Sequence, residues 1–265
     1  MKKLLVIPAR YHSSRFPGKP LAMIKGPDGK EVSLIERTWN LAMKIEEIDK
    51  RIIATDDISI KDFCENFGAE VCLTSDKLRN GSERVAEALS LQEENYDIIV
   101  NLQGDAPLTP PWVINELVTE LENSNYQVAT PVFKCDKVGL KNLLRDRKLG
   151  RVGATTVVFD NNCMALYFSK EVVPYTNEKE AFNKGTLVYH HIGVYAYTAP
   201  ALLSYLKLPP SVLENQEGLE QLRFIENSIP VKCIVSSLNG KEFWELNNPS
   251  DVKKIEEILR DNFDI

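Results

Sequence analysis

A cluster of cationic and hydroxyl side chains follows the first apolar run of the chain. The run 4–8 has the length of a β-strand, and the polar loop after it carries Arg10, Ser13, Ser14, Arg15 and Lys19. Cationic groups, hydroxyls and backbone N–H groups suit a polyphosphate, because each phosphate oxygen accepts charge-assisted hydrogen bonds. A solvated basic loop is the alternative, since cationic side chains usually lie on the surface. The position directly after a strand favours phosphate, because ligands of open α/β sheets bind at the carboxyl ends of the strands.

A carboxylate follows the most continuously apolar stretch, over residues 97–102. The exit of this predicted strand reads Gln103-Gly104-Asp105, and the glycine allows another group to approach the backbone closely. A carboxylate here can hold Mg²⁺, a hard cation that prefers oxygen ligands and bridges phosphate oxygens. The alternative is an aspartate that orders the next loop. With a cationic loop at the same edge of the sheet, a metal–nucleotide site is the better interpretation.

Strands that alternate with helices would bring these two features together. Apolar runs predict strands over 4–8, 51–55, 71–73 and 97–102. The pattern Ser33-Leu34-Ile35-Glu36 predicts a capping box, and Ser59 and Thr109 are expected to cap two further helices. The alternation through residue 132 predicts an α/β fold with a Rossmann-like, doubly wound and mainly parallel sheet.

The pattern changes after residue 132. Residues 155–159 and 164–169 are expected to form antiparallel strands around a turn at Asn161-Asn162. The length of 265 residues fits one domain over 1–265. Within it, residues 133–200 are expected to contribute a small β-rich lobe.

Composition excludes several classes of protein. The 32 basic and 38 acidic residues give a net charge of −6, so the chain is no general polycation for nucleic acid. Five scattered cysteines indicate reduced thiols in a cytoplasmic protein rather than a disulfide framework. No stretch resembles a signal peptide or approaches the ~20 apolar residues of a membrane span. We therefore expect a cytoplasmic protein without nucleic-acid or membrane partners.

The loop Ile7-Pro8-Ala9-Arg10 … Ser13-Ser14-Arg15-Phe16-Pro17-Gly18-Lys19-Pro20-Leu21 resembles the opening loop of the 3-deoxy-manno-octulosonate cytidylyltransferases, the CMP-Kdo synthetases. The later segments 101–107, 191–197 and 219–223 resemble the same family in the same order, so the resemblance spans nearly the whole chain. It implies the nucleotide-diphospho-sugar transferase type of fold, with the lobe at a dimer interface. It also implies an enzyme of lipopolysaccharide biosynthesis that transfers CMP from CTP to a 3-deoxy sugar acid, Kdo or a close relative, and releases pyrophosphate. Mg²⁺ would be the cofactor and a homodimer the assembly.

The resemblance further implies roles for individual residues. The catalytic residues would be Arg15, Lys19 and Asp105. The nucleotide would be bound by Pro8, Ala9, Arg10, Ser13, Ser14, Arg15, Lys19, Asn80, Gly81 and Ser82. The sugar acid would be bound by Gln103, His191, Tyr195, Glu220 and Gln221, and magnesium by Asp105 and Asn247. Without the resemblance, a core position would be the better explanation of Tyr195, and a helix surface the better explanation of Glu220 and Gln221.

Some positions depart from the usual pattern of the family. Ala106 stands where a glutamate usually follows the aspartate, and His190 stands where an arginine is usual. Asn247 occupies a position whose acidic residue normally supplies a second magnesium ligand, and Glu245 could replace it only if the loop shifts. One hypothesis is a divergent CMP-Kdo synthetase with a weaker metal site. Another is a cytidylyltransferase for a different acidic acceptor, such as 8-amino-Kdo, another nonulosonate-like acid or a phosphonate. A third is a nucleotide-binding relative that has lost catalysis.

Overall fold

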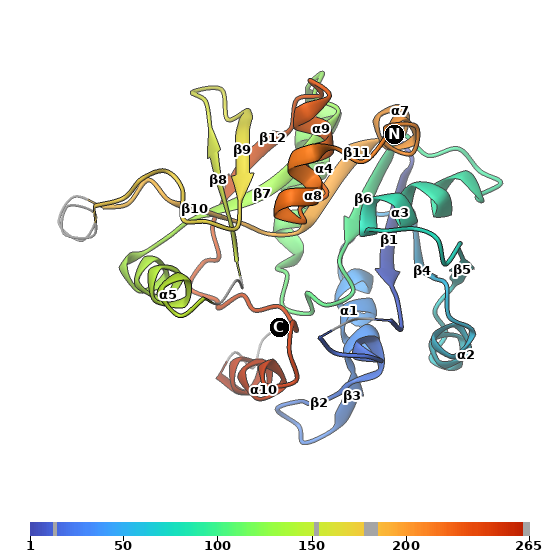
Figure 1. Ribbon diagram of the computed structural model, residues 1–265. Coiled ribbons are helices and arrows are strands. Elements are labelled where there is room, and N and C mark those ends of the chain that lie inside the picture. The colour runs from blue at the N-terminus through green and yellow to red at the C-terminus, as the bar shows by residue number, and fades with distance from the viewer. Residues whose placement is uncertain (13–14, 151–153, 178–184, 262–265) are drawn as a thin grey trace.

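The computed structural model describes residues 1–12, 15–150, 154–177 and 185–261. Within these residues, ten strands form one mixed sheet that has helices on both faces (Figure 1). The strand order is β5-β4-β1-β6-β11-β7-β10-β8-β9, and β12 pairs with β7 outside this path. The α/β fold predicted from the sequence is thereby confirmed.

The strands of the large sheet are β1 (Lys3–Ala9), β4 (Lys50–Thr55), β5 (Val71–Leu73), β6 (Ile98–Leu102), β7 (Val128–Lys134), β8 (Thr155–Phe159), β9 (Ala165–Ser169), β10 (Tyr189–His191), β11 (Val194–Thr198) and β12 (Lys232–Ser236). A separate antiparallel pair is formed by β2 (Met23–Lys25) and β3 (Glu31–Ser33). The helices are η1 (Lys19–Leu21), α1 (Leu34–Met43), α2 (Ile58–Asn66), α3 (Gly81–Ser90), α4 (Pro111–Asn123), α5 (Lys137–Lys148), α7 (Ala199–Tyr205), α8 (Val212–Glu217), α9 (Leu222–Glu226) and α10 (Asp251–Asp261).

The N-terminal half of the sheet is parallel and buried on both faces. Strands β5, β4, β1 and β6 run in the same direction. Successive side chains of β1 point to opposite faces, so Leu5 and Ile7 pack in one core cluster with α1 and α4, while Leu4 and Val6 pack in the other with α3. Burial on both faces explains why this strand reads as a continuous apolar run.

The other half of the sheet is largely antiparallel. Strand β11 lies between β6 and β7 and is antiparallel to both. Strands β10, β8 and β9 extend the sheet beyond β7 in antiparallel order, and β8 and β9 pair around the Asn161-Asn162 turn as predicted. Residues 133–200 therefore contribute both to the far side of the sheet and, through β11, to its centre.

The structure confirms one predicted helix cap and corrects two. Ser33 caps α1, and its side chain accepts a hydrogen bond from the backbone N–H of Glu36. Helix α2 is capped by Asp57 rather than Ser59, because the extended backbone at Asp57 lets its carboxylate accept from the N–H of Ile60. Thr109 does not cap α4, which begins after Pro110; its buried hydroxyl donates instead to the carbonyl of Ala106.

The C-terminal segment returns to the exit of β6. Helix α10 packs against β2 and α1 through a small apolar cluster that contains Ile24, Leu34, Leu246 and Ile255. Leu246 also donates its backbone N–H to the carbonyl of Asp105 at 2.9 Å. Residues 245–247 are thereby fixed beside the end of β6. None of the helices in the described ranges is both long enough and apolar enough to cross a membrane.

The loops that follow β1 and β6 approach each other so closely that only a glycine fits. A Cβ atom added to Gly104 would lie 2.8 Å from the carbonyl oxygen of Pro8, whereas one added to Gly193 would meet its neighbours at 3.6 Å or more. We expect Gly104→Ala to lower the free energy of unfolding by about 1–3 kcal/mol, because the backbone must shift. Gly193→Ala is the matched control and should change it by less than about 0.5 kcal/mol. Chemical denaturation measures both, and equal stabilities of the two variants would contradict the expectation.

Candidate active site

Two adjacent cavities open at the carboxyl ends of β1 and β6. They have volumes of about 470 Å³ and about 190 Å³. Both are lined by Arg10, Asn80, Gly81, Gln103 and Asp105, so these residues form the boundary between them. The carboxyl edge of the sheet, where the sequence predicts the site, therefore contains two adjacent cavities.

The smaller cavity collects most of the residues predicted to bind a nucleotide. It is lined by Pro8, Ala9, Arg10, Arg15, Lys19, Pro20, Leu34, Leu78, Asn80, Gly81, Arg84, Gln103, Gly104 and Asp105. Ser82 is buried behind this wall and pairs with Tyr197 through its hydroxyl. Ser13 and Ser14 lie outside the described residues. The cationic side chains of the opening loop therefore face one compartment, as a polyphosphate site requires.

Gly18 sets the position of Lys19. Its φ of 70° lies in the left-handed region, and its N–H donates to the carbonyl of Tyr11 at 2.9 Å. The turn leads directly into η1, which begins at Lys19. The ammonium of Lys19 contacts Asp105 Oδ2, so the predicted phosphate-binding lysine and the predicted metal-binding aspartate form an ion pair across the cavity.

The N-terminus of α3 forms another wall of the smaller cavity. Asn80 caps the helix and accepts a hydrogen bond from the N–H of Glu83 at 2.9 Å. One turn further on, the buried guanidinium of Arg84 donates to Asp56 Oδ2 at 3.1 Å rather than pairing with Glu87. The first turn of a helix carries partial positive charge, which together with Arg84 favours an anionic ligand.

The larger cavity contains every residue predicted to bind the sugar acid. Gln103, His191, Tyr195, Glu220 and Gln221 all line it. Its wall also includes Arg10, Arg79, Asn80, Gly81, Asp105, Ala154, Thr155, His190, Gly193, Glu214, Asn215, Gly218, Leu219 and Glu245. The strands β6, β10 and β11 and the segment 214–221 bring these side chains together from distant parts of the sequence.

Polar contacts orient the carboxylate and amides of this cavity. Glu220 accepts from the backbone N–H of Ser82 at 2.8 Å and from Gln103 Nε2 at 3.2 Å. Burial raises the pKa of Glu220. Gln221 is only 2% exposed, and its Nε2 has no hydrogen-bond partner among the described residues. An amide in this state is a ready donor for a ligand oxygen.

Burial favours the neutral form of the two adjacent histidines, His190 and His191. Burial lowers the pKa of His190 to about 4, and burial together with His190 lowers the pKa of His191 to about 3. His191 Nε2 shares a hydrogen bond of 3.0 Å with Thr130 Oγ1, and its ring contacts Phe168 and Tyr195. His190 therefore does not supply the positive charge that an arginine would bring to this position.

Of the two predicted metal ligands, Asp105 faces the cavities and Asn247 does not. Asp105 lines both cavities, but Asn247 lines neither of these two and donates its backbone N–H to Asp251 Oδ2 at 3.0 Å. Glu245 lines the larger cavity instead, and burial together with the nearby charge of Asp105 raises its pKa to about 7. No shift of the loop is needed for this arrangement. Ala106 is 1% exposed, so a methyl group is buried at the position where members of the family usually have a glutamate.

Sequence reasoning did not assign Leu78, Arg79, Glu214 or Glu245 to the site. Glu214 and Arg79 reach the larger cavity only because α8 packs beside the N-terminus of α3. The contact between Leu246 and Asp105 that positions Glu245 joins segments about 140 residues apart and leaves no local signal in the sequence. Arg84 had a detectable signal, because it lies one helical turn after the cap residue Asn80.

The buried state of His191 predicts how stability depends on pH. The pKa is about 3 in the folded protein against an ordinary value of 6.5, so the unfolded chain takes up this proton first as the pH falls. The contribution of neutral, buried His191 to the free energy of unfolding is fully present above pH 6.5. It is lost as the pH falls toward about 3. His191→Gln should flatten this decline by up to about 1.4 kcal/mol per pH unit. Denaturation across this range measures it, with the exposed His12→Gln as control; parallel curves for His191→Gln and the unaltered protein would refute the expectation.

Comparisons with known proteins agree with this geometry. Residues 4–235 match the family model for cytidylyltransferases. A 3-deoxy-manno-octulosonate cytidylyltransferase of Maricaulis maris is 39% identical over 260 residues, which cover 98% of this chain and 97% of that protein. One of Chlamydia abortus is 41% identical over 261 residues, covering 97% of this chain and 94% of that protein.

A solved structure is similar over the whole length. The CMP:2-keto-3-deoxy-manno-octonic acid synthetase complexed with CTP superposes with a TM-score of 0.82 at 28% identity, covering 99% of this chain and 100% of that one. Fold, length and sequence identity point to the same group of enzymes. The chain belongs to the cytidylyltransferase family and, within it, to the 3-deoxy-manno-octulosonate cytidylyltransferases.

Proposed function

We propose that this protein transfers CMP from CTP to a 3-deoxy sugar acid, Kdo or a close relative, and releases pyrophosphate. The observation that carries the proposal is the pair of cavities that meet at Arg10, Gln103 and Asp105. One cavity presents cations to phosphates, and the other presents hydrogen-bonding side chains to a hydroxylated acid. The α-phosphate of CTP would lie at the boundary, within reach of an acceptor hydroxyl.

The residues of the smaller cavity would act by alignment and electrostatics. The acceptor oxygen forms a bond to the α-phosphorus, the bond from that phosphorus to the bridging oxygen breaks, and pyrophosphate leaves. Arg15 and Lys19 would stabilise the charge that grows on the phosphates, while Arg10 holds the α-phosphate near the acceptor. Holding the reactants in line and offsetting charge can supply most of the rate enhancement in such a transfer.

The donors beside Lys19 fit a magnesium ion. Asp105 lines both cavities and Glu245 lines the larger one, so two carboxylates meet there, and Mg²⁺ prefers such oxygen ligands. We propose that these two side chains hold Mg²⁺, with Asn247 orienting Glu245 through an amide contact of 3.5 Å. When bound, the ion would offset phosphate charge and lower the pKa of the attacking hydroxyl.

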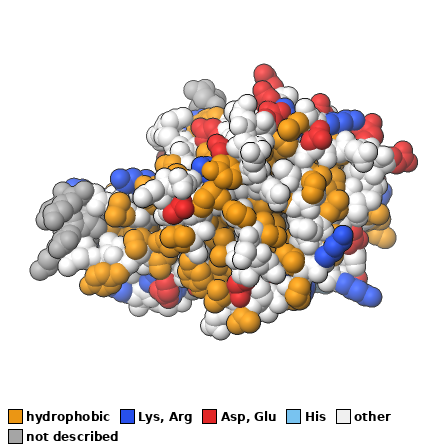
Figure 2. All heavy atoms as spheres, turned by 90° about the horizontal axis from the view of Figure 1, so that it is seen from above, with side chains coloured by type: hydrophobic (Ala, Val, Ile, Leu, Met, Phe, Trp, Pro, Cys, Tyr) orange, Lys and Arg blue, Asp and Glu red, His pale blue; other side chains and the backbone are white. Residues whose placement is uncertain are grey.

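The assembly proposed for the enzyme is a cytoplasmic homodimer that serves lipopolysaccharide synthesis. The face seen from above carries a broad band of hydrophobic side chains (Figure 2). On the sheet beyond β7, Leu166 of β9 is 59% exposed, and Val235 of β12 is 49% exposed. Apolar surface of this kind is typical of contacts between subunits. Light scattering of the purified protein tests the dimer, and a monomeric mass would refute it.

A second candidate acceptor is an aminated relative such as 8-amino-Kdo. The observation that favours it is the carboxyl of Glu220, which lines the larger cavity beside His190, whose neutral form is favoured by burial. A cationic substituent on the acceptor would pair with Glu220, for which the described part of the chain supplies no ion-pair partner. Kdo itself carries no such group.

The decisive experiment measures pyrophosphate release with Mg²⁺ and CTP against Kdo, 8-amino-Kdo and sialic acid, with ATP, GTP and UTP as controls. Turnover of Kdo supports the first proposal, and a strong preference for 8-amino-Kdo supports the second. Binding of CTP without turnover of any acid would indicate a relative that has lost catalysis. A chain that binds no CTP would overturn both proposals.

The cationic loop should be essential for the rate. Lys19→Met and Arg15→Met are each expected to lower kcat by about 10²–10³-fold, because a charge contact to the phosphates is lost in the transition state. Lys25→Met, on the exposed surface of β2, is the control and should turn over at the normal rate. Full turnover by either loop variant would show that this loop is not the phosphate site.

Direct metal binding separates the two candidate ligands. Glu245→Gln should weaken binding of Mn²⁺, used as a paramagnetic substitute for Mg²⁺, by about tenfold or more, because a charged ligand becomes neutral. Asn247→Ala should have a smaller effect, as the loss of a residue that orients a ligand. Electron paramagnetic resonance titrations of free Mn²⁺ measure both. A larger loss for Asn247→Ala than for Glu245→Gln would reverse the assignment.

A further inference from the structure

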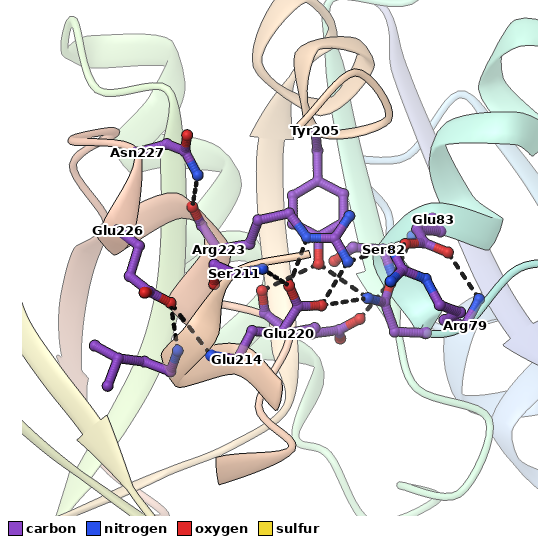
Figure 3. A network of polar contacts seen from close by, with 12 residues as sticks. Arg79, Ser82, Glu83, Tyr205, Ser211, Glu214, Glu220, Arg223, Glu226 and Asn227 are labelled. Atoms are coloured by element: carbon purple, nitrogen blue, oxygen red, sulfur yellow. Dashed lines mark hydrogen bonds and ion pairs between the residues drawn. The ribbon is translucent and has the colours of Figure 1, made fainter. Parts of the chain in front are cut away.

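A buried ion network lies beside the two cavities without lining the smaller one. Its centre is Arg223 of α9, which is 1% exposed and lies between Glu214 and Glu83 (Figure 3). Arg223 Nε donates to Glu214 Oε2 at 2.7 Å, and Nη2 donates to Glu83 Oε1 at 2.9 Å. The guanidinium also stacks on the ring of Tyr205, with its carbon 4.1 Å from the ring centre. One cation on α9 thus contacts its sequence neighbours α7 and α8 and also α3, which is distant in the sequence.

Each partner of Arg223 either lines a cavity or is linked to a residue that does. Glu83 lies in the first turn of α3, whose cap residue Asn80 lines both cavities. Glu214 of α8 lines the larger cavity and accepts from Asn80 Nδ2 at 3.2 Å. The hydroxyl of Tyr205 donates to the backbone carbonyl of Glu220, the residue whose carboxylate faces the acceptor space.

A second set of contacts joins the same two walls. The carboxylate of Glu220 accepts the N–H of Ser82 in the first turn of α3, and Asn80 Nδ2 donates to Tyr205 at 3.0 Å. Figure 3 shows Ser82 and Glu83 of α3 approaching Tyr205, Glu220 and Arg223 of the segment 205–223. The N-terminus of α3 and the segment 214–221 are consequently held as one unit.

The network depends on the shape and the charge of a guanidinium. Glu83 and Glu214 are 6% and 7% exposed, so without Arg223 two carboxylates would be buried close to each other. Arg79 also contacts Glu83, but its own side chain is half exposed and the structure records no contact between it and Glu214 in the described part of the chain. A lysine would keep the charge but could not donate along both directions of the fork and stack on Tyr205 at the same time.

We propose that Arg223 is a positioning residue that fixes the N-terminus of α3 relative to the segment 214–221, and so sets the distance between nucleotide and acceptor. This inference rests on the proposed function, in which the two ligands occupy the two cavities. Arg223 lines neither of these two cavities and would act through Asn80 and Glu220. A displacement of reacting groups by 1 Å can lower a rate by about 10²-fold, so a small shift of one wall has a large effect.

Arg223→Lys tests the proposal, because it keeps the charge and removes the fork. We expect kcat to fall by about 10²-fold and KM for the acceptor to rise. Calorimetry should show weaker binding of CTP, since Asn80 and Gly81 line its cavity. Glu226→Gln is the matched control: Glu226 joins α8 to α9 by accepting the N–H of Leu213 at 2.8 Å but contacts no residue of the two cavities other than the backbone of Glu214. This control should keep normal kinetic constants.

A second variant distinguishes a positioning role of Arg223 from an effect on the stability of the fold. Arg223→Met combined with Glu83→Gln removes one cation and one anion without altering a residue that lines either cavity, so it should melt at a higher temperature than Arg223→Met alone. We expect its kcat to stay as low as that of Arg223→Met, because the clamp between the walls is still absent. A purely structural role predicts that kcat recovers together with the melting temperature.

The outcomes distinguish this inference from the proposed function. If the unaltered protein turns over no acid, the proposed function fails, and the comparison of CTP affinities still tests Arg223. If the unaltered protein is active and Arg223→Lys retains both its kcat and its affinity for CTP, the positioning role is overturned while the proposed function stands.

Discussion

A close backbone approach between the ends of β1 and β6 holds the site together. Gly104 follows β6 and faces the carbonyl of Pro8 at the end of β1, at a distance that leaves no room for a side chain. This contact brings Asp105 to the loop that carries the cations, because adjacent parallel strands deliver their carboxyl ends to one edge. The C-terminal segment then attaches to the same point through Leu246. The cavities, their charges and the closing helix all depend on the register between β1 and β6.

Most of the fold could be predicted because its strands are short and continuously apolar. Burial on both faces of β1 and β6 leaves a strong local pattern, and the alternation with helices then determines the parallel half of the sheet. The first residue of each helix was harder to predict from the sequence. Competing cap residues such as Asp57 and Ser59 differ only in the backbone angle that each adopts, which the sequence does not reveal. The position of β11 between β6 and β7 follows from long-range pairing and was likewise not predictable from local pattern.

The site could be predicted where one continuous motif forms it. The loop 8–19 and the exit of β6 are local in sequence, and the structure brings both to the same cavities. The roles of Glu245 and Glu214 depend on contacts between the C-terminal segment, α8 and α3, which have no local signature. The resemblance to a family identified Asn247 by alignment, whereas packing of Leu246 turns Glu245 toward the cavity. Similarity to a family assigns positions along the chain, but the burial of the neighbouring Leu246 decides which of two nearby side chains faces the larger cavity.

The ion pair between Lys19 and Asp105 has a consequence for how ligands enter. The cavity is partly screened from water, so separating these charges without replacement would be unfavourable. A bare nucleotide would satisfy the lysine and leave the aspartate alone, and a bare cation would do the reverse. If Mg²⁺ binds as proposed above, a metal–nucleotide complex would supply a partner to each charge in one encounter. The ion pair would then favour entry of the complex over entry of either component alone.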